Sequence, residues 1–314
     1  MIKVADLAWG RLQSPDLDQQ EEFLVNFGMT RVERTKNKLF MRGTGPAHHL
    51  HITELGPPKF LGAAFVAKDE DDLKKLAKAP GASAVENLDE PGGGKRVRLT
   101  EPNGYTIEVV HGIPNLPPLP VQRQPINWRD TLHNRVGELM RIKRGPARVM
   151  RIGHVVLATN KLPETLKWFR ETIGLISSDD LYAGPDKKNV IASFNRLDRG
   201  DDYVDHHVFF AMAAPKSGLN HLSFEVDDID DVFVGHEHLK SMGKYEHMWG
   251  IGRHLLGSQV YDYWADPWMR VHEHWSDSDR LNAANGSNLM SIEEGFQSQW
   301  GEPPPEKFIH NVSP

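Results

Sequence analysis

Apolar and polar residues along the first third of the chain follow two periods, one typical of strands and one typical of helices. Residues 1–14 are expected to form a strand, and residues 15–27 a helix that opens at Pro15 and ends at Gly28. Further strands are expected at 29–34, 38–42, 48–53 and 60–68, an acidic helix at 69–79, and two strands around a Pro-Asn-Gly turn within 92–112. Helices and strands in this mixed order predict an α+β fold.

The same pattern returns in the second half of the chain. Segments 151–175, 218–232 and 262–275 match the opening strand and helix, the 60–73 segment and the closing turn and strand. This is an internal duplication, in which each copy supplies curved, barrel-like mixed sheets with helices outside. The expected division is a first module at 1–115, a proline-rich and partly helical linker at 116–147, a second module at 148–285 and a C-terminal arm at 286–314.

Composition narrows the chemistry. The 314 residues carry a net charge of −6, which argues against nucleic acid as a partner, and no apolar run approaches the roughly 20 residues of a membrane helix. The first residues lack the features of a signal peptide, so a cytoplasmic protein is expected. Because the chain has no cysteine, a metal site must use nitrogen and oxygen ligands. Of its 16 histidines, twelve lie from His133 onward.

Three residues of the second copy are candidate metal ligands. His154, His221 and Glu273 lie at corresponding ends of three strand-like segments. Two imidazoles and one carboxylate that meet from separate strands can hold one face of a metal and leave the other face open, as in non-haem iron(II) oxygenases. A single strand histidine is more often a hydrogen-bonded core or surface residue. The repeated positions favour the metal hypothesis.

The segments that hold these residues resemble the vicinal oxygen chelate superfamily, and within it the two-module type I extradiol dioxygenases that include catechol 2,3-dioxygenase. The resemblance covers about residues 1–285 and rests on GHVVL, NHLSFEV and the glutamate six residues after Pro267. It implies a homo-oligomeric enzyme of aromatic catabolism with Fe(II), for which Mn(II) is an allowed substitute. Such an enzyme inserts both atoms of O2 into a catechol-type ring, here a substituted catechol or a trihydroxybenzene, beside its hydroxyl pair.

Two further segments make the resemblance more specific. GRHLLGSQVYDYW places His254 and Tyr263 at 19 and 10 residues before Glu273, where the family has residues that orient the substrate. DHHVFFA resembles the strand that carries an active-site histidine, which would be His206 as the acid–base. His207 is the alternative if the register differs by one, because adjacent strand residues face opposite ways. Without the resemblance, Tyr263 reads as a core aromatic and His254 as a surface histidine.

The first copy lacks the ligand set. Strand alignment places Trp9 near the position of His154 and Gly62 near that of His221, while Glu108 is retained. This module is therefore expected to act as a scaffold. Residues His48, His49 and His51 could form a second metal site, although their alternation fits an exposed strand face equally well.

One turn departs from the family pattern. Asp266-Pro267-Trp268-Met269 lacks the usual glycine, so the loop before Glu273 is expected to differ in shape and to bring Trp268 toward the pocket. Four tryptophans, at positions 249, 264, 268 and 275, suggest an apolar-walled pocket that does not require a substrate carboxylate.

Two other functions remain open at this point. One is a glyoxalase-like lyase or epimerase that uses the same fold with a redox-inert metal. The other is a small-molecule binding protein of the same fold that holds no metal.

Overall fold

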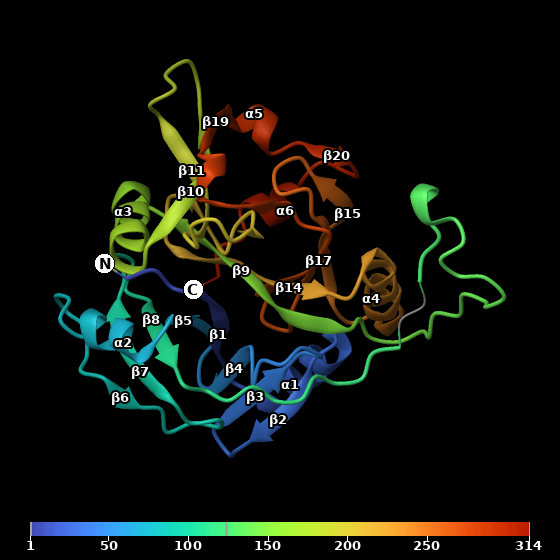
Figure 1. Ribbon diagram of the computed structural model, residues 1–314, viewed down its shortest axis with the longest axis horizontal. Helices are drawn as coiled ribbons and strands as arrows, with labels where there is room; N and C mark the ends of the chain where they lie inside the picture. The colour runs from blue at the N-terminus through green and yellow to red at the C-terminus, as the bar shows by residue number, and fades with distance from the viewer. Residues whose placement is uncertain (1, 123–124, 314) are drawn as a thin grey trace.

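The computed structural model describes residues 2–122 and 125–313, which form two open β-sheets flanked by helices (Figure 1). The strands of the first sheet are β1 (Asp6–Ser14), β2 (Thr30–Arg34), β3 (Lys38–Arg42), β4 (His51–Leu55), β5 (Lys59–Val66), β6 (Glu86–Asn87), β7 (Lys95–Thr100) and β8 (Thr106–His111). The strands of the second sheet are β9 (Val149–Thr159), β10 (Leu175–Tyr182), β11 (Val190–Leu197), β13 (Phe209–Ala213), β14 (Gly218–Val226), β15 (Glu246–His254), β16 (Val260–Ala265), β17 (Val271–Ser276), β19 (Asn288–Ser291) and β20 (Ser298–Trp300). A separate pair joins β12 (Val204–Asp205) to β18 (Arg280–Leu281).

The helices are short, and the longest cover the sheets from outside. They are α1 (Leu17–Phe27), α2 (Glu70–Leu76), α3 (Leu162–Ile173), α4 (Ile229–Met242), α5 (Ile292–Gly295) and α6 (Glu306–Ile309). None of the helices formed by the described residues is long and apolar enough to cross a membrane.

The two sheets repeat one topology. The first has the order β2-β3-β4-β1-β5-β8-β7-β6, and the second has β10-β11-β13-β9-β14-β17-β16-β15 in the equivalent places, with β19 and β20 added at its edges. The pairing directions also agree, because β1–β5 and β9–β14 are antiparallel while β5–β8 and β14–β17 are parallel. Both sheets are mixed and neither is closed. The prediction of an α+β fold with duplicated mixed sheets is confirmed.

The first helix shows how local sequence fixes an element. The side chain of Asp16 accepts hydrogen bonds from the backbone N–H groups of Asp18 and Gln19, and Gly28 ends the helix at φ 114°, where a side chain would be strained. The helix therefore begins two residues later than the sequence predicts, because Pro15 precedes the cap. Its buried face carries Leu17, Phe23, Leu24 and Phe27.

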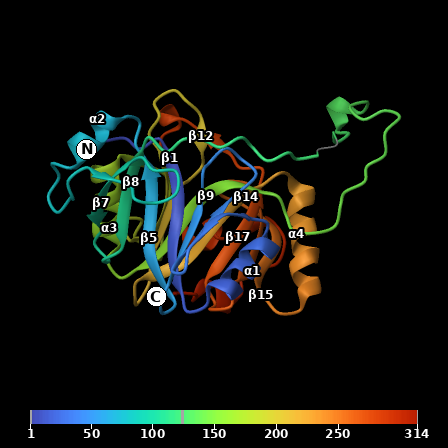
Figure 2. The same cartoon turned by 90° about the horizontal axis from the view of Figure 1, so that it is seen from below.

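The two sheets share one hydrophobic core, which includes apolar residues from β1, α1, β9 and β14. Figure 2 shows how these elements are arranged. Gly10 of β1 makes the close approach possible, because a Cβ there would lie 2.4 Å from Leu222 Cδ1 in β14. Polar groups join the halves as well. The buried guanidinium of Arg270 pairs with Asp266 and also donates to Ser14 Oγ in the first half, at 2.7 Å.

The linker at 116–147 and the C-terminal arm at 286–314 differ in structure. In the described part of 116–147, the helix that the sequence predicts is reduced to a 3-10 turn at Arg129–Thr131, on the loop at the right of Figure 1. The C-terminal arm instead packs on the second sheet. Strand β19 pairs with β10, β20 pairs with β15, and Ser313 bridges to Leu219.

Candidate active site

Three adjacent strands of the second sheet carry the predicted metal ligands. His154 lies on β9, His221 on β14 and Glu273 on β17, which are neighbours in that order. The registers place His154 opposite Ser223, and Ser223 opposite Glu273. An irregularity between Leu219 and His221 shifts the β9–β14 register at this point, and such bulges re-aim side chains. The fold therefore brings together three residues that are separated by 119 positions of sequence.

The donor atoms of these residues meet in the protein interior. His154 Nε2 lies 3.3 Å from His221 Nε2 and 2.9 Å from Glu273 Oε2, and His221 Nε2 lies 3.5 Å from the same oxygen. Ligand atoms held at about 2.1 Å from an ion and at right angles to one another would lie about 3 Å apart. The observed spacing therefore suits a divalent cation.

Glu273 supplies the strongest argument for a cation. Its side chain is fully buried, and neither carboxylate oxygen has a hydrogen bond of good geometry, although His154 Nε2 is close. Burial alone would raise the pKa of Glu273, but the close imidazoles of His154, His221 and His254 hold this pKa well below its ordinary value. A buried carboxylate that stays ionised without well-formed hydrogen bonds calls for a positive charge beside it. The residues present thus fit a metal ligand set.

The two predicted substrate-orienting residues, His254 and Tyr263, lie beside this set. His254 Nε2 is 2.9 Å from the Tyr263 hydroxyl and 3.8 Å from Glu273 Oε1. Burial, together with the Glu273 charge, holds the pKa of Tyr263 well above its ordinary value, so its hydroxyl keeps its proton. Burial lowers the pKa of His254, which favours its neutral form. The pair can therefore present a hydroxyl donor and an imidazole to a bound molecule.

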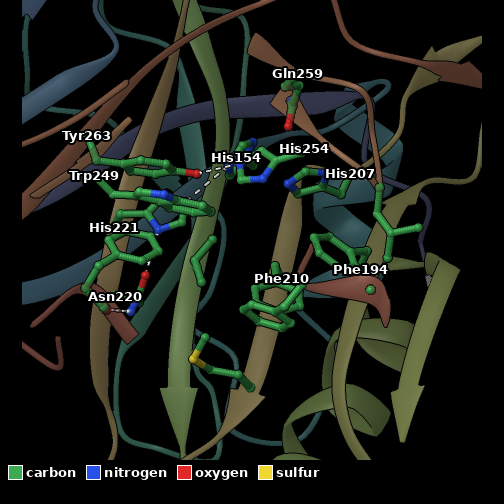
Figure 3. A pocket seen from close by; sticks show the side chains of 16 residues that line it. His154, Phe194, His207, Phe210, Asn220, His221, Trp249, His254, Gln259 and Tyr263 are labelled. Carbon is green, nitrogen blue, oxygen red and sulfur yellow. Dashed lines mark hydrogen bonds between the residues drawn. The ribbon is translucent and has the colours of Figure 1, made fainter. Parts of the chain in front are cut away.

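The structure turns His207, not His206, toward the ligand set. The His207 and His154 rings have centroids 4.1 Å apart, and His207 lines the cavity in Figure 3. His206 instead points to Asp179, whose Oδ2 lies 2.6 Å from its Nε2. The expectation that His206 faces the site is therefore corrected to the alternative, His207. The two rings still touch, with 3.1 Å between their Nδ1 atoms.

The cavity in front of the ligand set has mostly aromatic walls (Figure 3). Its lining includes Phe194, Phe210, Trp249, Phe296 and Phe308. Among the described residues that line it, none is lysine or arginine. Phe296 and Phe308 come from the C-terminal arm, whose place on the second sheet the sequence pattern did not predict.

Two polar residues of the cavity were missed from the sequence. Gln259 is buried, and neither its amide oxygen nor its amide nitrogen has a hydrogen-bond partner. Asn220 Oδ1 lies 2.7 Å from His221 Nδ1, and its amide nitrogen donates to the carbonyl of Asn311 in the arm, at 2.9 Å. Asn220 precedes a candidate ligand, which was the only signal available. Nothing in the sequence pointed to Gln259.

Of the four tryptophans expected near the pocket, only Trp249 lines it. Trp268 lies against the Arg270 guanidinium, with 5.3 Å from the carbon to the ring centroid. The turn that holds Trp268 also keeps the shape of its counterpart. Met269 has φ 64°, and Gly104 in the first copy has φ 95°. The expectation of a differently shaped loop with Trp268 in the pocket is therefore wrong.

The first sheet replaces the ligand set with a network of hydrogen bonds. Its registers pair Trp9 with Ala64 and Ala64 with Glu108, which is the arrangement of His154, Ser223 and Glu273. Here Glu108 accepts from Trp9 Nε1 at 3.2 Å and from Arg11 Nε at 3.0 Å. The Arg11 guanidinium thus neutralises Glu108, whereas the counterpart Glu273 in the second sheet has no such partner.

His48, His49 and His51 lie in β4 and the loop before it, and their side chains do not point to one common position. His49 and His51 are buried, so the alternative of an exposed strand face is wrong. His49 packs on Trp9, whereas His51 Nε2 lies 3.2 Å from His272 Nε2 of the second sheet. His49 therefore packs in the interior of the first module, and His51 lies in the contact between the two sheets.

Known proteins with similar sequences and structures agree with this architecture. Residues 151–268 match the model of the Glyoxalase/Bleomycin resistance protein/Dioxygenase superfamily. Metapyrocatechase 2 of Cupriavidus necator is 27% identical over 305 residues, which are 96% of this chain and 90% of that protein. A manganese-dependent 2,3-dihydroxybiphenyl 1,2-dioxygenase of Geobacillus genomosp. 3 is 24% identical, over 93% of this chain and 88% of that protein.

A solved structure extends the likeness to the whole fold. The Mn(II)-bound glyoxalase from Novosphingobium aromaticivorans has a TM-score of 0.79 and 22% identity, and the match covers 100% of this chain and 97% of that one. The whole fold, with its two sheets of one topology, is therefore similar to the fold of that solved structure. Residues 151–268 are thus similar to the glyoxalase and dioxygenase superfamily, and nearly the whole chain is similar in sequence to the metapyrocatechase and the dihydroxybiphenyl dioxygenase.

Proposed function

We propose that this protein is a metal-dependent extradiol dioxygenase that opens a catechol-type ring beside its hydroxyl pair. The observation that carries the proposal is the meeting of His154, His221 and Glu273 in a cavity that also holds His207, His254 and Tyr263. The names of the two sequence relatives, a metapyrocatechase and a dihydroxybiphenyl dioxygenase, support the same activity.

In this proposal His154, His221 and Glu273 hold the metal, for which we propose iron(II). Manganese(II) is the alternative, because nitrogen and oxygen ligands separate the two ions weakly and one relative is named as manganese-dependent. When bound, such an ion would provide one place where both catechol oxygens and dioxygen can bind next to each other. The first module then serves as a scaffold, since its retained glutamate, Glu108, already accepts a hydrogen bond from Arg11.

The protein groups around the metal position would handle protons. Tyr263 keeps its hydroxyl proton and can donate it to a substrate oxygen, while His254 accepts from or donates to the same hydroxyl. The pKa of His207 is held well below its ordinary value, first by burial and then by His154 and His206. A neutral His207 can accept a proton from a catechol hydroxyl and return it later, as a general acid–base must.

The neighbours of His207 would set its tautomer. If His206 Nε2–H donates to Asp179, then His206 Nδ1 carries a lone pair and accepts from His207 Nδ1–H. His207 Nε2 is then the basic nitrogen. Ser178 Oγ donates to the His206 carbonyl at 2.6 Å, which fixes the backbone at this point. In this arrangement His206 is a positioning residue for His207.

The cavity walls favour uncharged substrates. Because no lysine or arginine is among its described lining residues, a substrate carboxylate would be buried without a partner, at considerable cost. The unpaired amide of Gln259 offers a polar contact in a wall that is mostly aromatic and aliphatic. We therefore propose substituted catechols or trihydroxybenzenes, in which a third hydroxyl could bond to Gln259.

Oxygen uptake tests the proposal directly. Protein purified without oxygen and loaded with Fe(II) or Mn(II) would be mixed with catechol, a methylcatechol, a trihydroxybenzene and a carboxylated catechol. We expect O2 consumption and a yellow ring-opened product, with the carboxylated compound the slowest. A glyoxalase-like lyase would bind metal and consume no O2 with any of these compounds, and a binding protein would retain no metal. Either outcome would exclude the dioxygenase.

A further inference from the structure

A second cluster of side chains that can bind a metal lies where α4 packs on β15 and β16. His236 on α4, His247 on β15 and Asp262 on β16 place one donor atom each within 4.8 Å of the others. Asp262 is next to Tyr263 in β16 and therefore faces away from the cavity. The cluster is separate from the set of His154, His221 and Glu273.

One carboxylate oxygen is the focus of this cluster. Asp262 Oδ1 lies 3.2 Å from His236 Nδ1 and 2.8 Å from His247 Nε2. Zinc bonds of about 2.0–2.2 Å at tetrahedral angles place ligand atoms about 3.3 Å apart. A small outward movement of two imidazoles would therefore admit the ion. The same atoms can also simply hydrogen-bond, with both rings donating to the carboxylate.

The surroundings resemble those of a built metal site. Trp264 Nε1 donates to Asp262 Oδ2 at 2.5 Å, so the carboxylate is held by a second residue, as metal-ligating carboxylates usually are. The Trp264 ring also lies beside both imidazoles, with centroids at 5.6 Å from His236 and 4.8 Å from His247. A Cβ at Gly250 would come within 3.0 Å of Asp262 Oδ1, so glycine keeps this side of the oxygen clear.

Access from solvent is present on the histidine side. The Asp262 side chain is fully buried, whereas those of His236 and His247 are 16% and 33% exposed. An ion could enter between the two rings, and a water molecule could complete its coordination. The charges nearest to His236 on its own helix are Lys240 and Glu237, which have opposite signs.

We propose that His236, His247 and Asp262 form a second divalent-metal site, of the class that takes zinc with two imidazoles, one carboxylate and water. Such an ion would link α4 to β15 and β16. It would lie on the face of β16 opposite to the one that carries Tyr263. Its occupancy would stabilise this edge of the second sheet. The site takes no part in the chemistry proposed above, so its presence does not depend on that activity.

Zinc titration of protein already loaded with iron tests the proposal. Calorimetry would follow zinc binding, and elemental analysis after desalting would report zinc and iron per chain. We expect one zinc to bind with the iron retained, and we expect His236→Gln and His247→Gln each to weaken that binding roughly 100-fold or more. His238→Gln is the matched control, because His238 is on the same helix but bonds to Asn26. It should bind zinc as the unaltered protein does.

Circular dichroism in zinc-free buffer would check that the variants fold. If a histidine variant does not fold, Asp262→Asn provides the second test, since it keeps the shape of the side chain and removes its charge. The proposal is overturned if iron-loaded protein binds no additional zinc, or if zinc only displaces iron. It is also overturned if folded His236→Gln binds zinc as tightly as the His238→Gln control.

Discussion

His207 lies with its ring centroid 4.1 Å from that of His154, although His154 is on β9 and His207 is in the connection between β12 and β13. The neighbouring ring of His206 is turned the other way, to Asp179. This contact assigns the two adjacent histidines different environments: one borders the candidate metal ligands, and the other supports it from behind. The difference can be tested by changing one histidine at a time.

We predict that His207→Asn retains the metal and lowers turnover roughly 10²–10⁴-fold, because asparagine can hydrogen-bond but cannot exchange a proton at neutral pH. His206→Asn should have a smaller effect, since it alters only the orientation of His207. Metal content and oxygen uptake of both variants would be compared. A fully active His207→Asn together with an inactive His206→Asn would return the acid–base role to His206. Two fully active variants would remove the acid–base from this segment.

The sequence could not decide between these histidines for a definite reason. Alternation predicts that neighbours in a strand face opposite ways, but β12 ends at Asp205 and β13 begins at Phe209. Both histidines therefore lie in an irregular connection, where a count from the next strand is unreliable. His154, His221 and Glu273 lie inside strands that have counterparts in the first copy, and for them the pattern led to residues that the fold brings together.

Loss of one candidate ligand should remove most of the metal. We expect His221→Ala and Glu273→Ala each to retain little iron after desalting, because two remaining ligands form an incomplete site. Elemental analysis would measure the metal. His48→Ala is the control, since His48 lies in the first module beside His49. Full iron occupancy in either ligand variant would refute the assignment, and iron loss in the control would move the site to the first module.

Asn220 should act on the metal through His221. We predict that Asn220→Ala lowers metal affinity about 10- to 100-fold, because the ring of His221 loses the partner of its Nδ1 and its contact with the arm. Competition with a chelator would measure the affinity. Asn311→Ala separates the two roles: it removes the bond that the Asn311 side-chain amide donates to the Asn220 backbone carbonyl, at 2.7 Å, and leaves the Asn220–His221 contact in place. Unchanged affinity in Asn220→Ala would show that His221 needs no such support.

Tyr263 and His254 should affect rate more than metal binding. We expect Tyr263→Phe and His254→Phe to keep the metal and to lower turnover by roughly 10²-fold or more, since each removes a positioned donor or acceptor. Steady-state rates at saturating catechol, with metal content measured in parallel, would show this. Wild-type rates in both variants would contradict the role that the family resemblance assigns to this segment.

The turn before Glu273 shows a second limit of sequence reasoning. Without a glycine it was expected to change shape, yet Met269 adopts the left-handed conformation that Gly104 has in the first copy. Asp266 accepts from the backbone N–H groups of Trp268 and Arg270, as Glu101 does from Asn103 and Tyr105. The carboxylate at the start of each turn fixes the backbone, so the glycine is dispensable. Side-chain packing, which no local pattern reports, likewise decides which tryptophans face the cavity.

The ion network of the first module gives a prediction about pH. Glu90 accepts from both Arg11 Nη atoms, at 2.8 and 2.7 Å, and from Lys38 Nζ at 2.7 Å, while Glu54 and Glu108 add negative charge nearby. Burial would raise the pKa of Glu90, but Arg11 and Lys38 outweigh burial and hold this pKa at about 2. The ionised form is therefore more stable in the folded protein than in the unfolded chain.

The sign of the effect follows from the lowered pKa. Stabilisation by Glu90 is complete above its unfolded pKa of about 4.5 and is lost as pH falls toward 2. We predict that Glu90→Gln lowers the free energy of unfolding by about 3 kcal/mol at pH 7, and that the difference shrinks by roughly 1 kcal/mol at pH 3.5. Urea unfolding of the metal-free protein at both pH values would measure it. Glu86→Gln is the control, because its pair with Arg98 is largely exposed and should contribute less than about 1 kcal/mol. If Glu90→Gln were no more destabilising than Glu86→Gln at pH 7, the guanidinium network would not be what stabilises the metal-free module.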